Sequence, residues 1–79
     1  MITLNIVSPE KELFSGDVKE IRVPGSSGEF TILMNHAPIV SSLEKGEVRY
    51  VTLEGVAHTL DILDGFVEAS DNIVTLCIS

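Results

Sequence analysis

Apolar and polar residues alternate with a period of two along most of this chain. In the first segment, Ile2, Leu4 and Ile6 alternate with polar residues, until Ser8-Pro9-Glu10 stops the run. Such alternation predicts a β-strand with one buried face. Further segments of this kind, each bounded by turn-forming residues, cover residues 18–23, 48–53, 56–63, 66–69 and 73–78. No window holds an apolar helical repeat over three turns, so the pattern predicts an all-β domain.

The turn sequences set the expected number of strands. We expect Ser15-Gly16-Asp17 to form a turn after the short apolar segment Leu13-Phe14, and Glu54-Gly55 to form a hairpin turn. Other turns are expected at Pro24-Gly25, Ser26-Ser27-Gly28, Asp64-Gly65 and Ser70-Asp71-Asn72. This spacing gives about eight to ten short strands, which favours a two-sheet sandwich or a flattened barrel. Either architecture reduces the open strand edges that a single sheet would expose.

Composition and charge exclude several classes of function. With 79 residues the chain forms one domain, without internal repeats or linkers. Twelve acidic and five basic residues give a net charge of −7. Such a surface cannot neutralise phosphates, so nucleic acid is not expected as a partner, and neither is direct binding to an anionic membrane.

The apolar content is high for so small a domain. Apolar residues make up 44% of the sequence. Either the core takes nearly all of them, or some lie on an outer face that a protein partner covers, and we favour the second interpretation.

No segment is long and apolar enough to span a bilayer, and the first residues lack the features of a signal peptide. Cys77 is the only cysteine, so no intrachain disulfide is possible, and we expect a cytoplasmic domain. Cys77 itself is expected to be a small interior or edge residue.

The sequence offers little for catalysis. It holds no Gly-rich phosphate loop, no nucleophile elbow and no paired acid and base. His36, His58 and Cys77 are the strong nitrogen and sulfur ligands, and they are not at metal-ligand spacing. We therefore expect no catalytic residue, no metal and no cofactor.

A cofactor-carrier domain is the alternative from another class. Lipoyl and biotinyl carrier domains are acidic, all-β and of about this size, and they carry the cofactor on a lysine at a hairpin tip. Lys45 lies in a turn between Leu43 and Val48, but its neighbours do not resemble either carrier motif.

The central run from Val23 to Val40 is the most specific part of the sequence. It contains Pro24-Gly25, Gly28-Glu29-Phe30, Ile32-Leu33 and Asn35-His36-Ala37-Pro38-Ile39-Val40. Further landmarks follow the same order over the whole chain: Val7-Ser8-Pro9-Glu10, Leu13-Phe14-Ser15-Gly16, Leu43 to Gly46, Gly65-Phe66-Val67-Glu68 and Asn72-Ile73-Val74-Thr75-Leu76. Together they resemble the amino-terminal domain of the epsilon subunit of F-type ATP synthases.

This resemblance implies a fold, a set of partners and a location. The fold is a flattened β-sandwich of two roughly five-stranded sheets, which spans residues 1–79. In that family the domain catalyses nothing. One side packs on the gamma shaft of the central stalk and the lower end rests on the polar loops of the c-ring, so that proton-driven rotation is coupled to ATP synthesis. Membrane association then occurs only through the complex, on the cytoplasmic face of the bacterial inner membrane.

The chain departs from the family in two respects. Many members have Gly at the position of Thr31 and Pro-Gly at Met34-Asn35, so the loop before His36 is expected to differ in detail. The family also continues into a carboxy-terminal pair of helices that inhibits ATP hydrolysis, and nothing in the sequence corresponds to them. If 79 residues is the natural length, we expect inhibition by that route to be absent.

The resemblance assigns Glu29, Phe30 and His36 to the side that faces the c-ring. For Glu29 it implies a basic partner on the ring loop, whereas composition alone indicates an ordinary exposed carboxylate. For His36 the residues alone favour a hydrogen-bonded loop anchor.

Ile32 and Leu33 cannot both point inward from a regular strand. Either an irregular segment lets both reach the core, or one of them, or Met34, belongs to a subunit interface.

Overall fold

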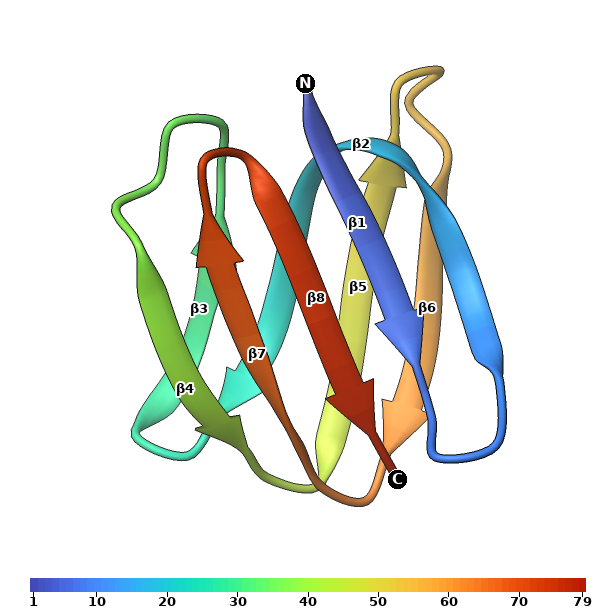
Figure 1. The fold of residues 1–79 in the computed structure, drawn as a ribbon, viewed down its shortest axis with the longest axis vertical. Helices are drawn as coiled ribbons and strands as arrows, with labels where there is room; N and C mark the ends of the chain where they lie inside the picture. The colour runs from blue at the N-terminus through green and yellow to red at the C-terminus, as the bar shows by residue number, and fades with distance from the viewer.

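The computed structural model describes residues 1–79 and contains eight β-strands and no helix. With no helix there is none that is long and apolar enough to cross a membrane. The strands are β1 (Ile2–Val7), β2 (Glu12–Gly25), β3 (Gly28–Ile32), β4 (Ile39–Leu43), β5 (Gly46–Thr52), β6 (Ala57–Ile62), β7 (Gly65–Ser70) and β8 (Ile73–Ile78) (Figure 1).

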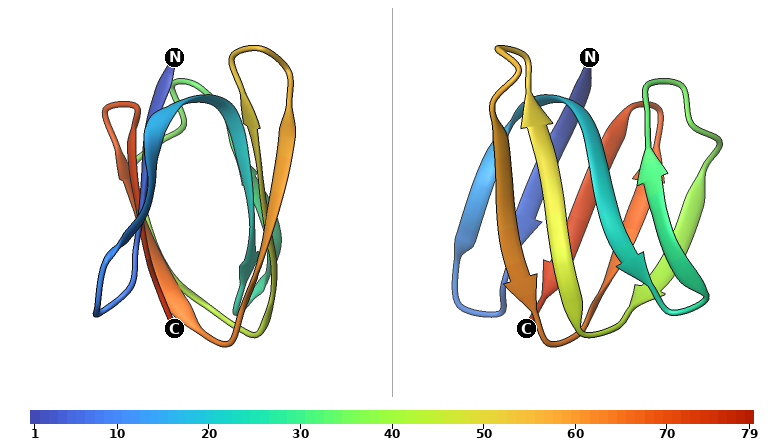
Figure 2. Two further views of the ribbon diagram at one scale, coloured as in Figure 1. Left: turned by 90° about the vertical axis from the view of Figure 1, so that its right-hand side faces the viewer. Right: turned by 180° about the vertical axis from the view of Figure 1, so that it is seen from behind.

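The strands form a flattened β-sandwich, which confirms the predicted fold class. The first layer contains β4, β7, β8, β1 and residues 12–18 of β2, and the second contains β3, residues 18–25 of β2, β5 and β6. All neighbours are antiparallel except β1 and β8, which are parallel. Figure 2 shows the two layers edge-on, with β2 arching from one to the other. The layers thus hold five and four strand segments, close to the five each that were expected.

Strand β2 differs from the sequence prediction in three ways. It includes Pro24-Gly25, which was expected to be a turn and instead pairs with Glu29 and Gly28 of β3. It runs through Ser15-Gly16-Asp17 without a turn, because Gly16 pairs with Leu4 of β1. Its register with β5 shifts between Val18 and Glu20, so an extra residue is inserted there and the strand bends into the other layer. The same bulge places both Val18 and Ile21 in the core, although simple alternation put them on opposite faces.

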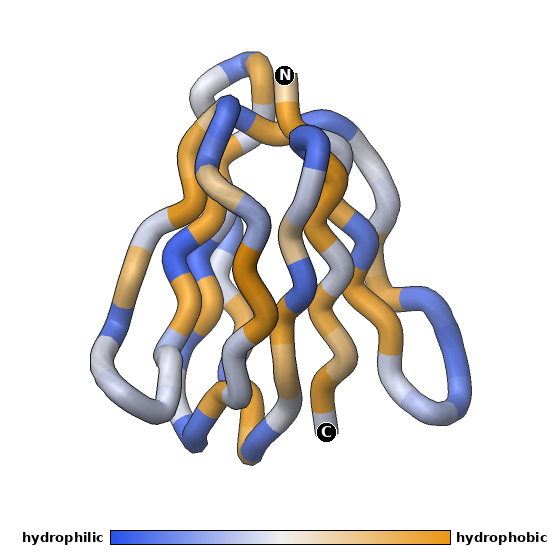
Figure 3. The backbone as a smooth tube through the Cα atoms, turned by 60° about the vertical axis from the view of Figure 1, so that its left-hand side comes forward, coloured by the Kyte–Doolittle hydropathy of each residue, from blue (hydrophilic) through white to orange (hydrophobic).

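The core consists of aliphatic side chains from both inner faces. Fifteen buried residues form one cluster, and no polar or charged residue is buried. The strands show the corresponding alternation of hydropathy along the backbone (Figure 3). Aromatic rings close one side of the sandwich, where Phe14 packs on Tyr50 and Tyr50 stacks on His58, with ring centroids 4.6 and 5.2 Å apart. Burial raises the pKa of the Tyr50 phenol.

The connections lie at the two ends of the sandwich. In the orientation of Figure 1, the loops at residues 33–38, 53–56 and 71–72 are at the upper end. Those at residues 8–11, 26–27, 44–45 and 63–64 are at the lower end. The Asp71-Asn72 turn links β7 to β8 with both residues at positive φ, 52° and 62°, as a two-residue hairpin of the favoured type requires.

Candidate functional site

The outer surface of the first layer carries exposed apolar side chains on neighbouring strands. Phe66 of β7 lies beside Cys77 of β8, which in turn lies beside Val7 of β1. Two further apolar residues lie on the same surface: Val40 of β4, which pairs with Glu68 of β7, and Ile73, the first residue of β8. We call this surface, formed by Val7, Val40, Phe66, Ile73 and Cys77, the outer apolar face. Val40 is 70% exposed, Ile73 53% and Phe66 49%, a large apolar surface for a domain of this size.

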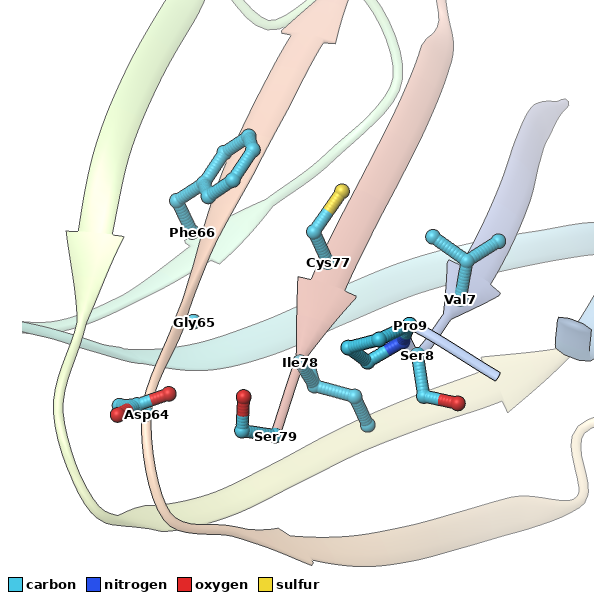
Figure 4. A pocket seen from close by; sticks show the side chains of 9 residues that line it. All are labelled: Val7, Ser8, Pro9, Asp64, Gly65, Phe66, Cys77, Ile78 and Ser79. Atoms are coloured by element: carbon cyan, nitrogen blue, oxygen red, sulfur yellow. The ribbon is translucent and has the colours of Figure 1, made fainter. Parts of the chain in front are cut away.

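Two hollows indent the outer apolar face. The larger, of about 480 Å³, lies near the lower ends of β7, β8 and β1 and is lined by Val7, Pro9, Phe66 and Cys77 among others. Figure 4 shows Phe66, Cys77 and Val7 in line across the three strands. The smaller, of about 390 Å³, lies between Pro38–Val40 and Glu68–Ser70. Both are open grooves over a sheet, a shape suited to the side chains of a protein partner.

Cys77 belongs to this face, which corrects the expectation of an interior or edge position. Strand β8 pairs with both β1 and β7, so it is not an edge strand. Its inward residues are Val74, Leu76 and Ile78, which leaves Cys77 half-buried on the outer side.

Glu29 lies at the lower end of the second layer, near other acidic residues. Glu29 of β3 pairs with Pro24 of β2, and Glu47 of β5 pairs with Asp61 of β6. Arg22 lies between two of the carboxylates, with Nε 3.7 Å from Glu29 Oε2 and Nη2 3.5 Å from Glu47 Oε1. One guanidinium therefore pairs with two carboxylates, and the three groups together carry a net charge of 2 × (−1) + 1 = −1.

The lower-end loops add a small net negative charge, since Glu10, Glu44 and Asp64 are offset in part by Lys11 and Lys45. Glu44 and Asp64 lie in the lower-end loops, and we call Glu29, Glu44, Glu47, Asp61 and Asp64 the acidic end. The Glu29 side chain is 61% exposed, so its ion pair with Arg22 contributes about 0–1 kcal/mol and leaves the carboxylate free for another cation.

Phe30 points toward the core rather than outward. Its ring packs against the core cluster and lies over Gly25, where a Cβ would be 2.7 Å from the ring. Phe30 thus fixes the β2–β3 hairpin that presents Glu29, and offers little surface to a partner.

His36 lies in the loop between β3 and β4, at the upper end. A β-strand rises about 3.3 Å per residue, so β3 alone separates Glu29 from this loop by about 13 Å. The structure therefore does not bring His36 and Glu29 together on one surface, contrary to the expectation above. The His36 Nδ1–H donates to the Ala37 carbonyl oxygen over 2.6 Å, since a carbonyl can only accept.

The two apolar residues that follow Ile32 point outward. Ile32 ends β3 and is 2% exposed, whereas Leu33 is 56% and Met34 54% exposed. Of the two explanations offered for this run, the structure favours the one in which residues after Ile32 are available to a partner.

Lys45 does not sit at a hairpin tip, which removes the geometric basis of the carrier alternative. The turn at residues 44–45 joins β4 to β5, and these strands pair with β7 and with β2 and β6 instead of each other. No group of three or more His, Cys, Asp or Glu side chains is arranged to hold a metal ion.

Composition predicted an outer apolar face, but the residues that form it were not identified from the sequence, although a signal for them was present. Ile39-Val40, Phe66-Val67 and Ile73-Val74 are apolar pairs on three strands of one layer. In a strand with one solvated face, one member of such a pair would be polar. Three pairs in one layer indicate that both of its faces are suited to burial.

Comparison with known families and sequences gives a consistent result. The sequence model of the family described as "ATP synthase, Delta/Epsilon chain, beta-sandwich domain" matches residues 1–79. The ATP synthase epsilon chain of Desulfitobacterium hafniense (strain DSM 10664 / DCB-2) is 45% identical over 74 residues, which cover 94% of this chain and 55% of that relative. That of Chlorobaculum tepidum is 40% identical over 70 residues, covering 89% of this chain and 80% of the relative.

Solved structures with the same fold come from mitochondrial ATP synthases. A chain in the Euglena gracilis assembly of OSCP, F1 and c-ring superposes with a TM-score of 0.91 at 23% identity, over 98% of this chain and 49% of that one. A chain in the Tetrahymena thermophila central stalk and c-ring gives 0.81 at 14% identity, over 98% and 62%. The present chain thus spans about half the length of the Desulfitobacterium and Euglena proteins.

Proposed function

Because the chain belongs to the family of ATP synthase delta and epsilon chains, as their β-sandwich domain, we propose that it is a non-catalytic part of the central stalk of a rotary ATP synthase. It links the gamma shaft to the c-ring and so couples proton transport to ATP synthesis. It is peripheral to the membrane, on the cytoplasmic face of the bacterial inner membrane, and associates with it through the complex.

The outer apolar face is the proposed contact with the gamma shaft. Its exposed apolar side chains and two grooves are the observation that carries the proposal, because a partner surface would bury them. Complete burial of a side chain such as Phe66 or Val40 is worth about 1.5–3 kcal/mol, and a few such anchors account for most of the affinity of an interface.

The acidic end is the proposed contact with the polar loops of the c-ring. A basic side chain on a ring loop would complement the charge that Arg22 leaves uncompensated between Glu29 and Glu47. Electrostatic contacts of this kind fix orientation more than they add affinity, which suits a surface that must stay in register with a rotating ring.

The fold connects the two proposed contacts rigidly. Strand β2 belongs to both layers and bends between them at the Val18–Glu20 bulge. A force applied at the acidic end therefore passes through hydrogen-bonded strands to the outer apolar face. In this mechanism the domain transmits torque through its packing and needs no reactive group.

Capture of the stalk tests the proposed function. A tagged form of the chain is added to detergent-solubilised membranes of its source organism, and the bound proteins are identified by mass spectrometry. We expect the gamma subunit and the c-ring to be recovered together with the catalytic subunits. Recovery of none of these subunits by a correctly folded bait would refute the assignment to the central stalk.

Glu29→Lys tests the contact with the ring. The change reverses the charge that faces the basic loop, so we expect ATP synthesis driven by a proton gradient in membrane vesicles to fall about threefold to tenfold. Stability should change by no more than about 1 kcal/mol, because the Glu29 side chain is mostly exposed.

Glu54→Lys is the matched control for this variant. Glu54 is exposed in the upper-end loop at residues 53–56, so the same change in net charge occurs far from the acidic end. We expect this variant to retain normal synthesis. Equal rates for the two variants would show that Glu29 has no particular role in coupling.

A further inference from the structure

Two asparagines at the upper end, in different connections, are hydrogen-bonded to each other. The Asn35 backbone N–H donates to Asn72 Oδ1 over 2.6 Å, and Asn72 Nδ2 donates to Asn35 Oδ1 over 3.2 Å. Asn35 lies in the loop at residues 33–38, and Asn72 lies in the turn between β7 and β8. Figure 1 shows these two connections next to each other at the upper end.

Both asparagines have left-handed backbones, with φ of 65° at Asn35 and 62° at Asn72. Asparagine adopts this conformation more readily than most residues, and unlike glycine it adds a donor and an acceptor. At each position the residue thus serves two purposes, the turn and the cross-link.

The loop has one other polar contact with the rest of the chain, from the Met1 terminal ammonium to Met34 Sδ (3.2 Å), and a thioether sulfur is a weak acceptor. The loop's internal backbone hydrogen bond, from His36 N–H to the Leu33 carbonyl oxygen (3.1 Å), closes one turn. Asn72 is itself well anchored, because its carbonyl oxygen accepts a hydrogen bond from the Thr3 N–H of β1 (2.9 Å). The asparagine pair therefore ties a weakly held loop to a fixed point of the sheet.

The loop borders the outer apolar face. Pro38 lines the groove that Val40 and Ser70 also line, and Leu33 and Met34 are exposed on the turn that Asn35 completes. The position of the loop thus sets the upper rim of the groove and the direction of two exposed apolar side chains.

We propose that Asn72 is a positioning residue, which latches the loop at residues 33–38 in the shape that receives the gamma shaft. This inference rests on the proposed function, since it takes the outer apolar face to be the shaft contact. Because these hydrogen bonds already order the loop in the free domain, less conformational entropy is lost when the partner binds.

Asn72→Gly removes the latch while keeping the turn. Glycine adopts the positive φ of Asn72 without steric strain, and Asp-Gly is a favoured sequence for this hairpin turn. Asp71→Gly is the matched control, because Asp71 also has a positive φ (52°) and takes no part in the latch. Two quantities are measured for both variants and the parent chain: exchange of the Asn35 amide proton by NMR, and the Kd for purified gamma subunit by calorimetry.

For Asn72→Gly we expect the Asn35 amide to exchange about tenfold faster and the Kd for the gamma subunit to rise about fivefold to tenfold. The control should change neither quantity, and both variants should remain folded. Unchanged exchange in Asn72→Gly would disprove the latch. Faster exchange with an unchanged Kd would keep the latch and disprove its role in positioning. If the parent chain itself fails to bind the gamma subunit, the proposed function is wrong and the positioning role falls with it, while the exchange data still decide whether the latch exists.

Discussion

Replacing Gly65 by alanine should destabilise the domain by about 3 kcal/mol, which lowers the midpoint of thermal unfolding by about 12–24 °C. A Cβ at this position would collide with the carbonyl oxygen of Cys77, and it would lie 3.1 Å from the Cα of Ile78. Both obstacles are backbone atoms of β8, so no side chain can move aside. For a domain of 79 residues, with an expected stability of about 4–12 kcal/mol, this is a large fraction.

The position of Gly65 explains why the sheet cannot relax around the new methyl group. Gly65 begins β7 and pairs with Ile78 on one side and with Leu43 of β4 on the other. Shifting β8 away would break the ladder that carries Phe66 and Cys77. The same change should therefore also disturb the arrangement of side chains on the outer apolar face.

Gly28→Ala separates the steric cost from the backbone cost. Gly28 also has a positive φ (130°), but a Cβ there would meet nothing within 4 Å. We expect the free energy of unfolding of this variant to fall by about 1 kcal/mol, because of the backbone conformation alone. Unfolding of both variants is followed by circular dichroism against temperature and guanidinium chloride. Equal losses would mean that the contact with Cys77 is not the cause.

Alternation along the chain was sufficient to predict most of the fold, because each strand has one face in a common core. It failed at β2, where the bulge between Val18 and Glu20 changes the phase. A bulge depends on the strand paired opposite, and this information is absent from a local pattern. The same limitation explains Ser15-Gly16-Asp17, a turn-like sequence that pairs with β1 as part of a regular strand.

The candidate site was less predictable than the fold. The resemblance drew attention to Glu29 and His36, which are seven positions apart in the sequence, yet β3 carries them to opposite ends of the domain. The outer apolar face draws its residues from β4, β7, β8 and β1, and only the pairing of these strands brings them together. From the sequence alone, an exposed apolar residue such as Val40 cannot be distinguished from a core residue. The distinction requires the pairing of its strand and the face of the sheet on which the residue lies.

Phe66→Glu should abolish most of the binding to the gamma shaft without unfolding the domain. Phe66 lines the larger groove on the side of β7, beside Cys77 of β8. In a protein interface the carboxylate would be desolvated without a partner, and the anchor ring would be lost. Aromatic anchors of an interface contribute about 2 kcal/mol or more, and burying an unpaired charge adds to this, so we expect Kd to rise at least about thirtyfold. Because Phe66 is half exposed in the free domain, the fold should tolerate the change.

Val56→Glu is the control that makes the Phe66 result interpretable. Val56 is 52% exposed, against 49% for Phe66, and it lies in the loop between β5 and β6 of the other layer. Both variants add one negative charge to a chain of net charge −7, so general electrostatic repulsion affects them alike. We expect the Kd of Val56→Glu for purified gamma subunit, measured by calorimetry, to stay within about twofold of the parent value. A comparable loss of affinity in both variants would show that added charge, and not this face, governs binding. Unchanged binding by Phe66→Glu would place the shaft contact on another surface, and because the second layer presents mainly charged side chains, the upper-end loops would then be the next surface to test.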